Sequence, residues 1–285
     1  MLSPLKLVRP TTVQEASLAL MELGDKAKLY AGGAELLLLL RNRLIDAEVL
    51  IDLKKIDRLR LLDANNGALR VGACLTHHEL AKNALVRERA PALALAESQV
   101  ANIRVRNQGT LGGNLAFNDP HSDPGTVLLV HNASVTIGNA KGERRVVLDE
   151  FFVDMYATAL EPGEVLLEVE IPSLPAGMSS GYLRLHRYQR PTLGVAAAAR
   201  ITEGIIDEAR LAVGCIGPKA QRLTELEAKI RGVTLSDAKR ILAEEKNYLR
   251  GLLQPVDDLL GSADYKLYMA GVMLGDTLEQ ACHAN

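Results

Sequence analysis

Changes in the spacing of apolar and polar residues divide the first part of the chain into short strands and helices. A capping-box pattern over 12–15 predicts a helix that ends at Gly24. Apolar runs over 27–31 and 49–53 predict strands, and a leucine-rich segment over 34–43 predicts a helix between them. We therefore expect alternating strands and helices up to about residue 58.

The pattern from residue 59 onward predicts a second mixed region. A capping box begins a helix at Thr76, and Asn139-Ala140-Lys141-Gly142 predicts a hairpin turn. The other predicted helices cover 91–100 and 127–130, and the predicted strands cover 69–73, 134–137, 144–148 and 164–171.

A stretch rich in proline and glycine, over 172–177, marks a boundary in the pattern. After it, strands are predicted over 181–186, 194–201 and 208–215, and helices at about 220–230, 235–249 and 263–280. Strands followed by helices on one side form an α+β layer. We therefore expect an α+β fold with one domain over 1–176 and a second over 177–285.

Composition narrows the possible functions. The formal charge of −2 and the absence of tryptophan argue against nucleic-acid binding. The longest apolar candidate, Leu36–Leu40, ends before Arg41 and is too short to span a membrane. Three scattered cysteines cannot all pair, which fits a cytoplasmic protein, and they are too few for an all-cysteine iron–sulfur cluster. Any such cluster must therefore belong to another chain.

Two glycine-rich turns are the strongest candidate ligand-binding features. Three glycines fall within five positions in Gly109-Thr110-Leu111-Gly112-Gly113-Asn114, where a backbone without Cβ atoms can approach a ligand. Thr110 and Asn114 can hydrogen-bond phosphate or hydroxyl oxygens, and Asp123 offers a carboxylate to a sugar. A second turn, Ala31-Gly32-Gly33-Ala34-Glu35, lies between a predicted strand and a predicted helix. We interpret the two turns as holding one diphosphate from two sides in a flavin-binding protein.

No side-chain pattern predicts catalysis by the chain itself. His77 and His78 are adjacent, so on a helix they point about 100° apart and make a poor metal pair. The run His121-Ser122-Asp123 contains triad residue types, but consecutive residues cannot face one another as a triad requires. A cofactor grip without an acid, base or nucleophile suits electron transfer.

The sequence around both turns resembles the FAD-binding medium subunit of molybdenum hydroxylases, the group of carbon monoxide dehydrogenase, xanthine dehydrogenase and hydroxybenzoyl-CoA reductase. The resemblance rests on Ala31-Gly32-Gly33-Ala34-Glu35-Leu36 and on the segment from Ile103 to Asn114, and it extends to 7–11, 163–172 and 213–218. It implies an FAD-binding domain of the vanillyl-alcohol oxidase type over 1–176, with subdomains of about 1–58 and 59–176. The implied C-terminal α/β domain has a three-stranded antiparallel sheet with helices.

The resemblance also implies roles for individual residues. The two turns hold the pyrophosphate, Asp123 contacts the sugar part of FAD, and Leu166 lies beside the adenine or the flavin. Arg184 stands where many members have lysine. An aromatic side chain that covers the flavin ring in the carbon monoxide branch aligns near Thr192, so Tyr188 is the candidate to replace it. The implied cofactor-binding set is Tyr30, Ala31, Gly32, Gly33, Ala34, Glu35, Ala101, Arg106, Thr110, Gly112, Gly113, Asn114, Asp123, Leu166 and Arg184.

The same resemblance implies a place in a larger complex. Electrons from a large molybdopterin subunit would cross the [2Fe-2S] clusters of a small subunit, reach this FAD and pass to NAD⁺, a quinone or oxygen. The implied assembly is a dimer of heterotrimers. Two alternatives remain open at this point: a self-sufficient FAD-dependent oxidoreductase, and a flavin-free scaffold module.

Overall fold

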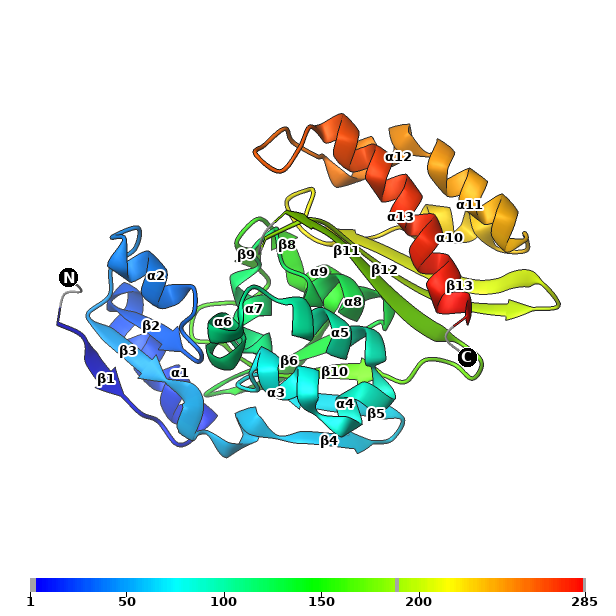
Figure 1. The fold of residues 1–285 in the computed structure, drawn as a ribbon. Coiled ribbons are helices and arrows are strands. Elements are labelled where there is room, and N and C mark those ends of the chain that lie inside the picture. Colours follow the sequence, from blue (N-terminus) through cyan, green and yellow to red (C-terminus); the bar gives the residue numbers. More distant parts are fainter. Residues whose placement is uncertain (1–3, 188–189, 284–285) are drawn as a thin grey trace.

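The fold is taken from a computed structural model, which describes residues 4–187 and 190–283. At its N-terminal end, three parallel strands form a sheet in the order β1-β3-β2, with Val49 opposite both Lys6 and Ala27 (Figure 1). The elements of this part are β1 (Lys6–Val8), α1 (Val13–Leu23), β2 (Ala27–Tyr30), α2 (Leu36–Arg41) and β3 (Val49–Asp52), with short 3-10 turns η1 (Gly24–Lys26), η2 (Leu53–Lys55) and η3 (Asp57–Arg60).

Local signals set the ends of the first helix as the sequence predicts. Thr12 Oγ1 accepts a hydrogen bond from Glu15 N at 3.1 Å, and Glu15 Oε2 accepts one from Thr11 N at 2.8 Å. Gly24 then ends α1 with φ +53°, a conformation that glycine adopts at little cost. The predicted helix is confirmed.

A five-stranded antiparallel sheet, in the order β4-β5-β10-β6-β7, forms the middle of the molecule, and short helices cover it (Figure 1). Its strands are β4 (Leu62–Asn65), β5 (Ala68–Gly72), β6 (Ser134–Asn139), β7 (Gly142–Val147) and β10 (Val165–Pro172). The helices are α3 (His77–Lys82), α4 (Ala84–Arg89), α5 (Pro91–Gln99), α6 (Ile103–Gln108), α7 (Leu111–Phe117), α8 (Pro124–Val130) and α9 (Leu148–Phe151), and a separate hairpin joins β8 (Phe152–Asp154) to β9 (Ala157–Thr158).

The C-terminal layer has a sheet of four antiparallel strands, so the expectation of three strands was wrong. The fourth strand pairs only Gln221 and Arg222 with β13, too short a segment to show an alternating pattern. The predicted helix over 235–249 is broken at Glu245 into two helices. The elements are β11 (Ser179–Arg187), β12 (Arg190–Thr202), β13 (Ile205–Gly214), β14 (Gln221–Arg222), α10 (Thr224–Ile230), α11 (Leu235–Glu244), α12 (Lys246–Leu253) and α13 (Ala263–His283).

An alanine run in β12 allows helices to pack on both faces of this sheet. Ala196 and Ala198 belong to the core shared with the central sheet, where α8 and α5 lie against the strands. Ala197 and Ala199 alternate to the other face and belong to the core under α13. Small side chains keep both helix layers close to the sheet.

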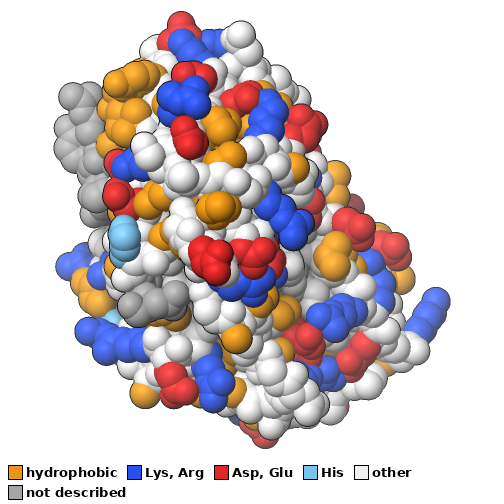
Figure 2. Space-filling model, turned by 90° about the vertical axis from the view of Figure 1, so that its right-hand side faces the viewer, with side chains coloured by type: hydrophobic (Ala, Val, Ile, Leu, Met, Phe, Trp, Pro, Cys, Tyr) orange, Lys and Arg blue, Asp and Glu red, His pale blue; other side chains and the backbone are white. Residues whose placement is uncertain are grey.

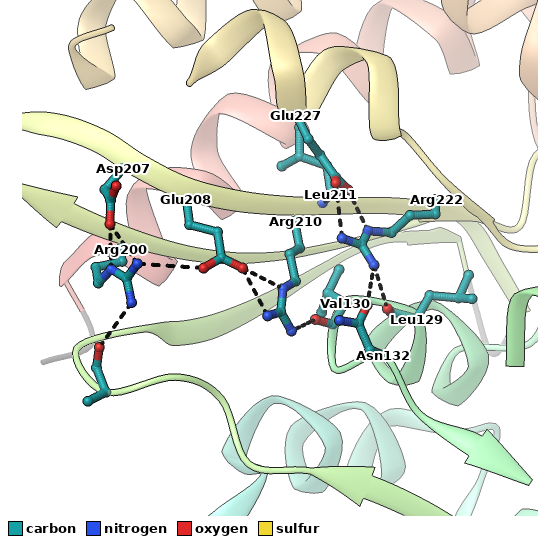
Figure 3. A network of polar contacts seen from close by, with 11 residues as sticks. Leu129, Val130, Asn132, Arg200, Asp207, Glu208, Arg210, Leu211, Arg222 and Glu227 are labelled. Atoms are coloured by element: carbon teal, nitrogen blue, oxygen red, sulfur yellow. Dashed lines mark hydrogen bonds and ion pairs between the residues drawn. The ribbon is translucent and has the colours of Figure 1, made fainter. Parts of the chain in front are cut away.

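Arginines of the C-terminal sheet hold the carboxyl end of α8 (Figure 3). Arg222 Nη1 donates to Leu129 O at 3.2 Å and to Asn132 Oδ1 at 2.6 Å, while Arg210 Nη1 donates to Val130 O at 3.4 Å. Glu227 holds the Arg222 guanidinium from the opposite side. Cations at the carboxyl end of a helix satisfy its free carbonyl groups and complement its dipole.

On the face of the molecule drawn in Figure 2, Lys and Arg side chains are interspersed with Asp and Glu side chains. Among the helices of residues 4–187 and 190–283, none is long and apolar enough to cross a membrane.

Candidate functional site

A cleft of about 440 Å³ lies where the N-terminal sheet, the central helices and β12 meet. Both glycine-rich turns line it, so residues far apart in the sequence share one wall. All but three of the implied cofactor-binding residues line this cleft: Ala31, Gly32, Gly33, Ala34, Glu35, Ala101, Thr110, Gly112, Gly113, Asn114, Asp123 and Leu166.

The two glycine turns touch through their backbones. A Cβ on Gly32 would collide with the main-chain oxygen of Gln108 and lie 3.0 Å from Gly109 Cα. Gly33 has φ +75°, which disfavours other residues, and a Cβ there would collide with the Tyr30 ring. Glycine is therefore required first for the packing of the turns on each other.

The polar side chains of the second turn serve the protein itself. Thr110 Oγ1 accepts a hydrogen bond from Gly113 N at 3.1 Å and so caps α7. Asn114 Oδ1 accepts one from Ser122 Oγ at 2.6 Å. The sequence predicts that both side chains can also hydrogen-bond phosphate or hydroxyl oxygens of a ligand, and both residues line the cleft. In the structure, Gly113 lies exposed between them and leaves the cleft open at this point.

Asp123 is a buried carboxylate shared between the cleft and the C-terminal sheet. It is 3% exposed, it accepts a hydrogen bond from the Tyr182 hydroxyl at 2.5 Å, and Arg184 Nη1 lies 3.3 Å from its Oδ2. Burial raises the pKa of Asp123 from 3.8 to about 6, against the opposing effects of Arg184 and Tyr182.

The raised pKa of Asp123 predicts a specific pH dependence of stability. Between about pH 4 and pH 6 the folded chain keeps a proton on Asp123 that the unfolded chain releases, so this group's contribution falls as pH rises. Relative to Asp123→Asn, the wild-type free energy of unfolding should fall by about 3 kcal/mol across that window. Urea denaturation of the apo chain at several pH values measures this difference. Parallel stability curves for the two proteins would contradict the prediction.

Three residues of the implied cofactor-binding set, Tyr30, Arg106 and Arg184, lie behind the residues that line the cleft. The Tyr30 ring supports Gly33 and carries Lys54 Nζ at 3.7 Å from its centroid. Arg106 Nη1 donates to the carbonyl oxygen of Ala101 at 2.9 Å, so it shapes a segment that lines the cleft. The Arg184 side chain is 4% exposed and pairs with Asp123.

Several cleft residues were not predicted to belong to the site: Cys74, His77, Asp119, His121, Ser122 and Arg190. The Asp119 carboxylate lies 3.6 Å from His121 Nδ1 and 3.5 Å from Arg190 Nη2. Among the implied residues, Glu35 also lies near Asp119, and burial and that neighbouring carboxylate raise the pKa of Glu35. In the sequence, Asp119 and His121 lie four and two residues before the predicted Asp123. This closeness in sequence is the signal that could have indicated that they belong to the site.

The other predictions about the site have mixed outcomes. Thr192 is buried in β12, and the cleft is lined instead by its neighbours Arg190 and Pro191. Tyr188, the candidate to cover the flavin ring, lies outside the described residues. No group of three or more His, Cys, Asp and Glu side chains that could hold a metal ion occurs in the part of the chain that the structure describes.

Family comparisons identify the class of protein. Residues 3–174 match the FAD binding domain in molybdopterin dehydrogenase, and residues 184–281 match the CO dehydrogenase flavoprotein C-terminal domain. The chain belongs to the FAD-binding medium subunits of molybdenum hydroxylases, a family of oxidoreductase subunits with FAD as cofactor.

Individual members of the family are similar in sequence to this chain over nearly the whole length of both proteins. The chain is 32% identical over 274 residues to the carbon monoxide dehydrogenase medium chain of Hydrogenophaga pseudoflava, covering 95% of each. It is 26% identical over 281 residues to the xanthine dehydrogenase FAD-binding subunit of Escherichia coli O157:H7, covering 97% of this chain and 95% of that one.

Solved structures of related enzymes match the fold of this chain over nearly its whole length. Carbon monoxide dehydrogenase from Hydrogenophaga pseudoflava, in a form lacking the Mo-pyranopterin moiety, matches with a TM-score of 0.93 and 32% identity over 99% of this chain and 98% of that one. Quinoline 2-oxidoreductase from Pseudomonas putida 86 matches with a TM-score of 0.92 and 28% identity over 100% and 99%.

The residues present fit FAD. The cleft volume of about 440 Å³ lies in the range of cofactor sites. Gly113 leaves open a position that a larger side chain would fill, and the wall formed by Gly32 and Gly109 exposes backbone to the cleft.

Proposed function

We propose that the chain is the electron-transfer subunit of a molybdenum hydroxylase. In this proposal FAD takes electrons from the [2Fe-2S] clusters of a small subunit, which receives them from a large molybdopterin subunit, and passes them to an external acceptor. The observation that carries the proposal is the cleft itself, because it joins both glycine turns and Asp123 in one cavity of a size suited to a cofactor.

An apolar rim beside the cleft supports docking of another subunit. In helix α2, which is rich in leucine, Leu40 is the buried residue. Leu38 is 47% exposed and Leu44, just beyond the helix, is 68% exposed, while their neighbours Leu39 and Ile45 line the cleft. Exposed leucines grouped at a cofactor site are typical of a partner-facing surface.

We also propose the finer organisation that the resemblance implies. The family matches end at residue 174 and begin again at 184, which supports an FAD-binding domain over 1–176 and a second domain over 177–285. The separate N-terminal and central sheets support two subdomains of the vanillyl-alcohol oxidase type. We place a dimer of heterotrimers in the cytoplasm, where the free Cys74, Cys215 and Cys282 suit a reducing medium.

Reconstitution tests the proposed function. The FAD-loaded chain alone should not reduce its flavin with hydroxylase substrates, because the substrate reacts at another subunit. Adding the small and large subunits of the proposed complex should give flavin reduction, followed by absorbance in a stopped-flow experiment. Reduction by the isolated chain with an organic substrate at roughly 1 per second or faster would favour the self-sufficient oxidoreductase instead.

A further inference from the structure

A buried histidine–glutamate pair stands directly behind the second glycine turn. His77 Nδ1 lies 2.5 Å from Glu97 Oε2, and the two residues are 2% and 0% exposed. Within the described part of the chain, the other carboxylate oxygen, Glu97 Oε1, has no hydrogen-bond partner. A buried carboxylate is costly unless a donor compensates it, so the pair demands an explanation.

The imidazole of His77 is fixed against the turn. His77 N donates to Gly109 O at 3.1 Å, and Leu111 N donates to Leu75 O at 3.0 Å, so α3 and the turn are joined on both sides of the histidine. A Cβ built on Gly109 would lie 3.2 Å from His77 Nε2. His77 also lines the cleft, and within the described residues its ring is held through Nδ1.

The basic side chains of the cleft are unevenly placed. Four basic residues line it, and two of them, His121 and Arg190, already face Asp119. Lys28 lies on β2, before the first turn. His77 is the basic residue that packs against the glycine turn itself, where a diphosphate would bring negative charge.

We propose that His77 donates a hydrogen bond from Nε2 to an oxygen of the FAD diphosphate, and that Glu97 positions the ring by accepting from Nδ1. An imidazole whose Nδ1 donates to a carboxylate can also donate to phosphate when it carries a proton on Nε2. The inference rests on FAD binding by this chain and is independent of electron transfer between subunits.

Binding measurements on the full chain test the pair. After FAD is removed, dissociation constants for FAD and for ADP, which shares the diphosphate, are measured by fluorescence titration and competition. His77→Ala should weaken both roughly 10- to 100-fold, and His77→Gln, which retains an amide donor, should recover part of the loss. The neighbouring His78→Ala is the matched control and should bind as the wild type.

A double-variant comparison separates the two roles. Glu97→Ala should weaken FAD binding, but His77→Ala combined with Glu97→Ala should bind no more weakly than His77→Ala, because Glu97 acts through the histidine. A folded His77→Ala that binds FAD within about threefold of the wild type would overturn the proposal. Loss of FAD affinity with unchanged ADP affinity would overturn the assignment to the diphosphate.

Nuclear magnetic resonance of histidine-labelled wild-type chain gives a reading that needs no folded variant. The Nε2 resonance of His77, assigned by through-bond correlations in the wild-type chain, should shift when ADP binds. An unchanged resonance at saturating ADP would overturn the proposal even if the alanine variant failed to fold.

Discussion

Replacing Gly113 with valine is expected to abolish FAD binding and to leave the chain folded. Gly113 lies exposed in the cleft, and a Cβ there meets only Thr110 Oγ1, at 2.9 Å, which a small rotation relieves. The branched side chain would then project into the position that we assign to the diphosphate. We expect the affinity for FAD to fall roughly 100-fold or more, a change of about 3 kcal/mol.

Flavin content of the purified chain and titration of the apo chain measure this effect. Gly251→Val is the matched control, because Gly251 lies exposed in helix α12 with open space around it. Its helix should weaken about as much as that of Gly113→Val, but its flavin content should match the wild type. A Gly113→Val chain that purifies with full flavin would show that the turn does not hold the cofactor.

Replacing Gly32 with alanine should have the largest effect on stability. The added methyl group would collide with the main-chain oxygen of Gln108, and neither backbone can move without separating the two glycine turns. We expect a loss of about 3 kcal/mol or more in the free energy of unfolding.

Urea denaturation of the apo chain separates this effect from cofactor loss, since no FAD is present. Gly251→Ala should be neutral or slightly stabilising, because alanine favours an exposed helix. If Gly32→Ala unfolds at the same urea concentration as the wild type, the close contact between the turns is not maintained in solution.

Features with local causes could be predicted from the sequence. The helix after Thr12 begins with the predicted side-chain cap and the helix after Thr76 with the complete capping box, because those contacts span only a few residues. The fourth C-terminal strand could not be predicted, since its two residues are held in the sheet only by pairing with β13. Tertiary pairing of this kind leaves no periodic signal.

The site divides in the same way. The glycine turns could be predicted because only glycine meets their backbone requirements. The sequence analysis places the two turns side by side, and they are in contact in the structure. The additional roles of Thr110 in capping α7 and of Asn114 in accepting from Ser122 could not be predicted, because these partners meet only after α7 forms and Ser122 folds back. The buried pairing of His77 with Glu97 spans twenty residues and has no sequence spacing of its own.

The placement of Asp123 has a consequence for how the protein matures on the ribosome. Its partners Tyr182 and Arg184 lie on β11, and Arg190 and Pro191 complete the cleft. Asp123 directly precedes helix α8, and the carboxyl end of that helix is held by Arg210 and Arg222, which come later in the chain. The cleft therefore lacks part of its wall until about two thirds of the chain has left the exit tunnel, and we expect flavin loading to be a late step of biosynthesis.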